Sequence, residues 1–355
     1  MTRRAAIILA GGESRRFQLE NENWQDKALA ELFGKPLMIH AVESVHTAVD
    51  EVVVCVNDEI RKARYSKVLA KYGLENIRIF IDEKVGDLGG PIIAILTGLK
   101  SVNADYCLTL PCDTPLLQPK VANYLFEKAK GHRVVVPMWP DGRLETLMMI
   151  CERSNIFEIT DILCQLGRSR PDDIIRGASS VLFVSPTGEL RDLDPDLKSF
   201  VNINVRNDLV QLQTRQIFGP AVENSSIMSP SLKPRELRLL HEASELQRKG
   251  EFVEASRVFS FCCDFLEDEN LYFWAAIGRE NEGRSLFEWS KRQVDPKSAR
   301  KAAKRGETAV LKAAKNYALE AVTYDANSLP FLARRARDNK SWCELRACEK
   351  AELSI

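Results

Sequence analysis

The chain has 355 residues and 45% hydrophobic content, enough to bury a large core and more than one domain. Lys plus Arg and Asp plus Glu are equal at 50 each, so the net charge gives no reason to expect nucleic acid or an anionic membrane as a partner. No apolar run approaches the roughly 20 residues that cross a bilayer, and the apolar stretch at residues 5–10 is shorter than a signal-peptide core. We expect a cytoplasmic protein with no nucleic-acid or membrane partner.

Residues 5–205 alternate apolar, β-branched runs with amphipathic stretches. The predicted strands cover residues 5–10, 51–56, 77–81, 105–110, 133–137, 147–151 and 180–184. The predicted helices cover residues 36–48, 59–72, 91–101, 117–130 and 154–166. This alternation with short links predicts an α/β fold with a mainly parallel, doubly wound, Rossmann-like sheet. In such sheets, ligands bind beyond the carboxyl ends of the strands.

A glycine pair, Gly11 and Gly12, follows the first predicted strand, within the run Leu-Ala-Gly-Gly-Glu-Ser-Arg-Arg-Phe at residues 9–17. Glycines there expose backbone N–H groups with no Cβ in the way of a ligand, and Arg16 and Lys27 can add positive charge. The segment lacks the Gly-Lys-Ser/Thr of a Walker loop and the third glycine of a dinucleotide-binding fingerprint. It predicts a phosphate-binding turn of another kind, although a purely structural turn is the alternative.

Asp113 directly follows the strand predicted at residues 105–110 and a Pro-Cys pair, and it precedes Thr114 and Pro115, which turn the chain away. We therefore expect its carboxylate at the same edge of the sheet as the glycine turn. Mg²⁺ keeps most of its waters and needs only one or two protein oxygens, so Asp113 is the candidate metal ligand. The alternative is an aspartate that serves a turn or caps a helix.

Nine cysteines are scattered along the chain without any Cys-x-x-Cys spacing, and only four histidines accompany them. This pattern predicts reduced, mostly buried thiols in a reducing compartment and gives no zinc–cysteine site.

Ordered segments resemble the molybdenum cofactor guanylyltransferases, within the nucleotidyltransferase superfamily of the glycine-rich Leu-Ala-Gly-Gly type. These segments are residues 9–17, 34–37, 89–95, 110–115, 141–147 and 200–204. The resemblance covers roughly residues 5–212. It implies a fold of the nucleotide-diphospho-sugar transferase type, Mg²⁺ as cofactor, and transfer of GMP from GTP to molybdopterin or molybdenum cofactor with release of pyrophosphate.

The resemblance also implies roles for single residues on the nucleotide side. Backbone groups of Leu9 and Ala10 would contact the base, Gly11 and Gly12 would bind the nucleotide, and Lys27, Arg16 and Asp113 would serve catalysis. A carboxylate shortly before the Gly-Gly-Pro segment would accept hydrogen bonds from guanine. Asp82 and Glu83 are the two candidates, and the spacing from Pro91 favours Glu83.

On the acceptor side, the resemblance implies that Arg143 and Glu145 contact the molybdopterin, with the Arg143 fork suited to its phosphate. Asn202 and Asn204 alternate on a strand-like segment and therefore point to one face. By the resemblance, this pair returns to the site of Asp113, where either side chain could bind the metal or the substrate, and the alternative is that both only form a turn. We favour Asn204 for the metal and Asn202 for the acceptor.

The chain departs from the family pattern at three places. Gln18 replaces a usual glycine, the loop that follows it is longer and contains Glu20 and Glu22, and Thr146 stands where members often have proline. The departures at Gln18 and Thr146 motivate one alternative, a nucleotide-binding scaffold without activity. Within the enzymes of the same fold, the alternatives are a cytidylyltransferase or a sugar-phosphate nucleotidyltransferase.

The composition shifts to Gly, Pro, Ser and Asn around residues 219–234, which predicts a linker between a nucleotidyltransferase domain at 1–218 and an all-helical domain at 235–355. Helical patterns cover residues 236–249, 252–266, 270–291, 297–323 and 327–338, and the first two form a helical-repeat-like hairpin. Residues 291–315 are rich in Lys and Arg, which fits a solvated helix surface better than an anion-binding one. We expect the helices to dock a protein partner or a second copy of the chain.

Overall fold

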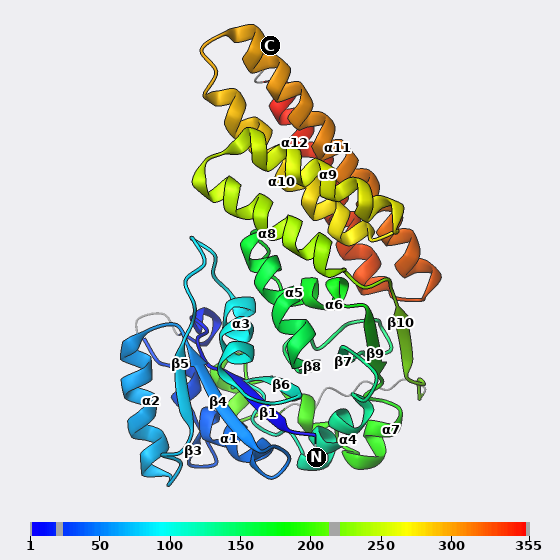
Figure 1. Ribbon diagram of the computed structural model, residues 1–355. Helices are drawn as coiled ribbons and strands as arrows, with labels where there is room; N and C mark the ends of the chain where they lie inside the picture. Colours follow the sequence, from blue (N-terminus) through cyan, green and yellow to red (C-terminus); the bar gives the residue numbers. More distant parts are fainter. Residues whose placement is uncertain (1, 19–23, 213–220, 353–355) are drawn as a thin grey trace. The chain divides into compact units, whose positions relative to one another are not determined.

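The computed structural model describes residues 2–18, 24–212 and 221–352. The chain forms two compact units (Figure 1). The first comprises Met1–Cys164 and Ser169–Ile227, and the second comprises Gln165–Arg168 and Met228–Ile355.

The first unit contains an eight-stranded sheet in the order β10-β9-β7-β8-β6-β1-β4-β5 (Figure 1). Its strands are β1 (Arg4–Leu9), β4 (Glu51–Val56), β5 (Arg78–Ile81), β6 (Tyr106–Pro111), β7 (Val134–Pro137), β8 (Met149–Glu152), β9 (Ser180–Val184) and β10 (Ser225–Met228). β1 is parallel to β4 and β6, β4 to β5, and β7 to β9, whereas β8 is antiparallel to both of its neighbours. The predicted mainly parallel α/β sheet is confirmed.

Helices cover the sheet on both faces. Successive side chains of β1 point to opposite sides of the sheet, and each side is packed against helices. The helices are α1 (Leu37–His46), α2 (Glu59–Lys71), α3 (Pro91–Ser101), α4 (Pro119–Lys128), α5 (Arg153–Gln165), α6 (Asp172–Gly177) and α7 (Glu189–Leu193). Ala6 and Ile8 of β1 belong to the buried cluster that α1, α2 and α4 complete. Ile7, between them, packs against α3, where Gly98 leaves no room for a Cβ. The sheet is therefore doubly wound.

The order of the strands reverses next to β1. The chain runs outward from β1 to β4 and β5, and α3 then returns it to β6 on the other side of β1. Leu9 at the end of β1 lies opposite Pro111 at the end of β6. Crevices at such reversals are where open α/β sheets bind ligands, so residues 10–12 and 112–113 meet at this position.

One segment that we expected in the linker belongs to the sheet instead. Ser225–Met228 form β10 beside β9, and Ile227 is buried. Asn224 prepares this pairing, since its Oδ1 accepts the Ser185 N–H at 2.9 Å. The expected break at Gly219 and Pro220 lies outside the described residues.

The second unit is helical, as predicted. It consists of α8 (Pro234–Lys249), α9 (Phe252–Asp268), α10 (Tyr272–Lys291), α11 (Pro296–Ala326) and α12 (Pro330–Glu352), and each helix packs against the next. Gly250 ends α8 with a φ of 79°, which turns the chain into α9. α12 is much longer than the helix expected at 327–338, because Cys343 and Ala347 extend its buried face. No helix in the described part of the chain is long and apolar enough to cross a membrane.

Candidate functional site

The ends of β1 and β6 bring a lysine and an aspartate into contact. The Cys112 N–H donates to the Leu9 carbonyl at 3.1 Å, which joins the segments that follow the two strands. Lys27 Nζ lies 2.5 Å from Asp113 Oδ2. Their side chains are 12% and 26% exposed, so the pair remains open to a ligand on one side. The glycine turn and Asp113 thus share one edge of the sheet, as their positions after strands predicted.

Gly11 and Gly12 differ in how much space surrounds them. Neither has a φ in the left-handed region, so backbone conformation requires glycine at neither position. A Cβ on Gly11 would lie 3.2 Å from both the Asn57 backbone nitrogen and Asp82 Oδ2, so packing restricts that position. A Cβ on Gly12 would meet no atom within 4 Å. The fold therefore does not require glycine at residue 12, and the exposed backbone there is open to a close approach by a ligand.

Leu9 and Ala10, predicted to contact the base, each have one backbone group in a hydrogen bond to a neighbouring segment. The Leu9 carbonyl accepts from Cys112, and the Ala10 N–H donates to the Cys55 carbonyl at 2.9 Å. Arg16 lies exposed on a short 3₁₀ helix, Arg15–Phe17, which begins after Ser14 at a φ of 55°. In the described part of the chain, no hydrogen bond or ion pair joins Arg16 to Lys27 or Asp113. The roles assigned to these three residues stay predictions.

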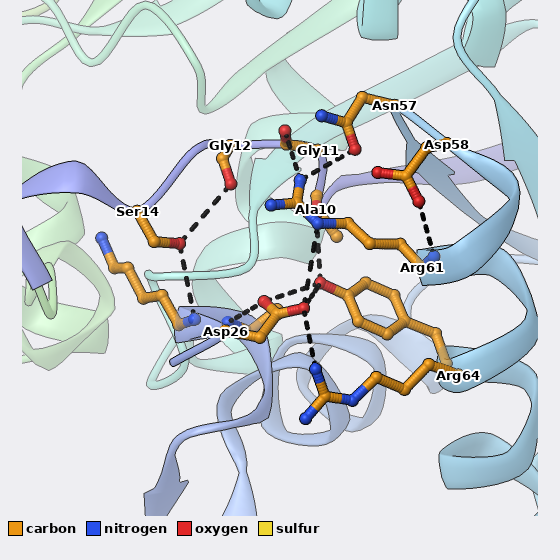
Figure 2. Close-up of polar contacts among 12 residues, drawn as sticks. Ala10, Gly11, Gly12, Ser14, Asp26, Asn57, Asp58, Arg61 and Arg64 are labelled. Carbon is orange, nitrogen blue, oxygen red and sulfur yellow. Dashed lines mark hydrogen bonds and ion pairs between the residues drawn. The ribbon is translucent and has the colours of Figure 1, made fainter. Parts of the chain in front are cut away.

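Polar side chains of α2 support both the glycine turn and the lysine segment, as Figure 2 shows. Arg61 Nη1 donates to the Gly11 carbonyl at 2.7 Å and to Asn57 Oδ1 at 2.8 Å. The Tyr65 hydroxyl lies 2.9 Å from both carboxylate oxygens of Asp26, the residue before Lys27. Burial, with the Asp26 charge, raises the pKa of Tyr65 well above its usual value, so the hydroxyl stays a donor.

Sequence reasoning assigned no role to Asp26, Asn57, Arg61 or Tyr65. The spacing of Arg61 and Tyr65 by four residues on a predicted helix was the available signal, because it places both on one helix face. Nothing local to the sequence indicates that this face meets residues 11 and 26, which lie far earlier in the chain.

The structure separates the two carboxylates that follow β5. Glu83 forms an ion pair with Lys100 of α3 at 2.7 Å, and its side chain is 38% exposed. Asp82 instead faces Gly11, and its Oδ1 is buried with no hydrogen-bond partner. Burial raises the pKa of Asp82 to about 7, while the positive charge of Arg61 opposes this rise. The preference for Glu83, based on spacing, therefore has no support from the geometry, and Asp82 is the carboxylate at the glycine turn.

Replacing Asp82 with Asn is expected to stabilise the nucleotide-free protein above pH 7. Because burial raises the pKa from 3.8 to about 7, the folded chain retains a proton at Asp82 that the unfolded chain releases in this interval. Stability therefore falls as the pH rises from about 4 to 7, and the charged carboxylate lowers it above pH 7. We expect D82N to raise the free energy of unfolding by about 1–3 kcal/mol at pH 8 and to lose most of this gain at pH 4.5.

Urea unfolding at the two pH values measures this effect, and Glu83→Gln is the matched control. Glu83 is adjacent to Asp82 but its side chain is 38% exposed and paired, so E83Q should follow the wild type at both pH values. If D82N were less stable than the wild type at pH 8, or if the two variants behaved alike, the ionised Asp82 carboxylate would not be destabilising the folded protein.

The asparagine segment returns to Asp113 through its backbone. The Ile203 N–H donates to the Asp113 carbonyl at 2.8 Å, and the Thr114 hydroxyl donates to Asn202 Oδ1 at 2.6 Å. The Asn204 N–H donates to Asp208 Oδ2 at 2.6 Å. Asn202 therefore ties this segment to the turn after β6, and Asn204 is held one residue beyond the contact with Asp113.

Two of the three residues predicted to contact the acceptor, Arg143 and Glu145, lie on the loop after β7, whose carboxyl end shares an edge with those of β1 and β6. Glu145 Oε1 accepts from the Trp139 indole N–H at 2.6 Å and so supports the loop. The Arg143 guanidinium lies over the Trp139 ring, 5.5 Å from its centroid. Its Nε and Nη2 are buried without a hydrogen-bond partner, so Arg143 retains donors for an anion.

The donor set at Asp113 fits a weakly coordinated hard cation. In the described residues, no group of three or more His, Cys, Asp and Glu side chains could hold a metal ion. One accessible carboxylate, with an asparagine segment hydrogen-bonded to the same residue, matches Mg²⁺, which binds few protein oxygens when substrate phosphates supply the others. It does not match a zinc site.

Comparison with known proteins gives a consistent result for the first unit. Residues 6–181 match the MobA-like NTP transferase domain, and the helical region lies outside this match. The chain is 32% identical over 207 residues to a probable molybdenum cofactor guanylyltransferase of Methanosarcina acetivorans, covering 58% of this chain and 88% of that protein. The corresponding protein of Haloferax mediterranei is 30% identical over 217 residues, covering 61% and 95%.

A solved structure of molybdopterin-guanine dinucleotide biosynthesis protein A from Archaeoglobus fulgidus also matches. It has a TM-score of 0.47 and 22% identity, and the match covers 58% of this chain and 95% of that one.

Proposed function

The chain belongs to the family of MobA-like NTP transferases, which includes the molybdenum cofactor guanylyltransferases, and on this basis we propose that it transfers GMP from GTP to molybdopterin or molybdenum cofactor. The observation that carries the proposal is the Lys27–Asp113 pair beside the open backbone of Gly12. It combines a cation for phosphate, a carboxylate for a metal ion and free backbone N–H groups at the reversal of the sheet.

The proposed reaction is an attack by a phosphate oxygen of the acceptor on the α-phosphorus of GTP. A new bond forms between that oxygen and the phosphorus, the bond to the β-phosphate oxygen breaks, and pyrophosphate leaves. Lys27 stabilises the negative charge that develops on the phosphates, since it is a point charge with three rotatable donors. The Gly12 backbone allows the triphosphate to lie against the turn.

Mg²⁺ would be held by Asp113 and Asn204 together with phosphate oxygens, and when bound it supplies charge neutralisation for the transferred phosphoryl group. Lys27 Nζ donates to one carboxylate oxygen of Asp113. We propose that Lys27 turns towards the phosphates when the nucleotide binds, which exchanges one anionic partner for another.

Guanine selection is proposed for Asp82. Guanine presents adjacent N1–H and N2–H₂ donors, and a carboxylate can accept both, whereas cytosine has no such edge. The Asp82 carboxylate supports this role, because its Oδ2 faces Gly11 and its buried Oδ1 has no hydrogen-bond partner. Arg143 is proposed to bind the phosphate of the acceptor, because its free donors form the planar fork that suits phosphate.

The test compares how strongly each nucleotide stabilises the protein and then measures pyrophosphate release. With Mg²⁺ present, GTP should raise the thermal unfolding midpoint more than CTP, ATP or UTP, and adding molybdopterin with GTP should release pyrophosphate. A larger shift with CTP would favour a cytidylyltransferase. GTP binding without pyrophosphate release would favour a scaffold, the alternative that the departures at Gln18 and Thr146 motivate.

The helical unit contains none of the residues proposed for this chemistry. We propose that it docks a protein, either an enzyme that receives the cofactor or a second copy of this chain. Exposed apolar side chains on α11 and α12 support this, with Val322 and Leu345 at 64% and 60% exposure. The nine free thiols support a cytoplasmic, reducing compartment.

A further inference from the structure

Asp26 is a buried carboxylate next to the candidate catalytic lysine. Only 2% of its side chain is exposed. Besides the Tyr65 hydroxyl, it accepts the Ala28 N–H at 3.2 Å and thereby caps the 3₁₀ helix Lys27–Leu29. A buried carboxylate costs free energy unless partners satisfy it, so these contacts fix its position. Because it is enclosed in this way, Asp26 is a support for Lys27 and not a ligand-facing group.

Two arginines of α2 lie on the same side of Asp26. Arg61 Nε is 3.8 Å and Arg64 Nη1 is 4.0 Å from Asp26 Oδ2. Arg61 is 10% exposed and Arg64 is 54% exposed. The inner arginine therefore interacts in a poorly solvated setting, whereas water screens the outer one.

Arg61 also contacts the glycine turn, on the other side of the site from Asp26. Its Nη1 donates to the Gly11 carbonyl and to Asn57 (Figure 2). Tyr65, on the next turn of α2, donates to Asp26. Residues 11 and 26 are far apart in the chain, yet one face of one helix fixes both. The Ser14 hydroxyl adds a longer link, since it accepts the Lys27 N–H at 3.4 Å.

We propose that Asp26, Tyr65 and Arg61 form a positioning network that sets Lys27 and the Gly11–Gly12 turn at the separation that a triphosphate requires. The proposal rests on the proposed nucleotidyl transfer. It assigns these residues no contact with the substrate. Their effect on nucleotide binding passes through Lys27 and the turn, and this distinguishes the network from a part of the core that only stabilises the fold.

Titration of the full chain with GTP and Mg²⁺ by calorimetry tests the proposal. Asp26→Asn and Tyr65→Phe should each raise the Kd for GTP by about 5–20-fold, because Lys27 is then held less firmly. Arg64→Lys is the matched control from the same helix face, and it should stay within about twofold of the wild type because this side chain is exposed. Arg61→Lys, which keeps the charge but loses the fork, should weaken binding as Y65F does.

A double-mutant cycle with Lys27→Ala separates positioning from simple stabilisation. If Tyr65 acts through Lys27, Y65F should change the Kd by less than about twofold in the K27A background. Thr160→Val is the stability control, because it removes a buried hydroxyl that donates to the Ile156 carbonyl in α5, away from this site. T160V should leave the Kd unchanged even where its unfolding midpoint falls as much as that of Y65F.

The outcomes are distinct. Independent effects of Y65F and K27A on binding, or a T160V that weakens GTP binding equally, would overturn the network. A wild type that binds CTP and not GTP would contradict the proposed guanine function alone, and the same cycle with CTP would still decide on the network. A wild type that binds no triphosphate would overturn both. If Y65F does not fold, D26N in the same cycle gives the decision, because Asp26 holds the lysine segment and not the glycine turn.

Discussion

Asp113→Ala is expected to abolish turnover while the protein remains folded. Its side chain is 26% exposed at the edge of the sheet, and among the described residues its carboxylate has a hydrogen bond and ion pair only with the Lys27 ammonium, so its loss should leave the core intact. It would remove the anionic oxygen proposed for Mg²⁺ and thus the charge stabilisation of the transferred phosphoryl group. We expect kcat to fall by about 10³-fold or more, which is typical for the loss of a group that stabilises transition-state charge.

Pyrophosphate release with GTP, Mg²⁺ and molybdopterin measures this effect. Asp196→Asn is a suitable control, because this aspartate is 65% exposed and pairs with Lys198 on the surface of the same unit. D196N should retain wild-type turnover. Wild-type turnover of D113A in Mg²⁺ would mean that Asp113 serves the turn after β6 and not a metal ion.

Lys27→Ala is expected to raise the KM for GTP and to lower kcat together. The ammonium should bind the phosphates in the ground state and bind them more strongly as negative charge develops, so both parameters should change. A combined loss of about 10²-fold in kcat/KM corresponds to about 2.7 kcal/mol of transition-state stabilisation. Removing Lys27 also leaves Asp113 without its cation, so the affinity for Mg²⁺ should not fall.

Steady-state kinetics with each substrate varied in turn gives the separation. Lys71→Ala, at the exposed end of α2, is the control and should not change either parameter. If K27A changed the KM for molybdopterin and left the KM for GTP unaltered, Lys27 would belong to the acceptor side.

The patterns that determine the fold are local, which is why the sequence alone predicts them. The runs at residues 51–56 and 180–184 are β-branched and short, and both form strands with the expected bounds. Gly11, Gly12 and Asp113 follow strands, so their approach at one edge needed only the rule that parallel strands end together. Lys27 was recognisable because it lies between the glycine turn and the next segment that resembles the family.

The positions of single side chains depend on packing between distant segments. Asp82 and Glu83 are adjacent carboxylates; spacing favoured Glu83 for the guanine contact, whereas Asp82 is the one that faces Gly11. β5 pairs with β4 through Ile81, and the Asp82 N–H still donates to the Val56 carbonyl at 2.7 Å. This register turns Asp82 towards the glycine turn and leaves Glu83 to α3. A one-residue step reverses the face of an extended chain, and only the register of the sheet decides it.

Packing between distant segments also decides the environment of Asp26, which the sequence did not single out, and of Arg143 and Glu145, which were assigned by resemblance. Whether Asp26 is buried depends on where α2 packs, and Glu145 is engaged by Trp139 while Arg143 keeps free donors. The sequence by itself determined the sheet, the helical region and the motifs, because periodicity and glycine positions act over a few residues. Which side chains face the site was decided by tertiary structure, because hydrogen-bond partners and burial come from segments that lie tens of residues apart.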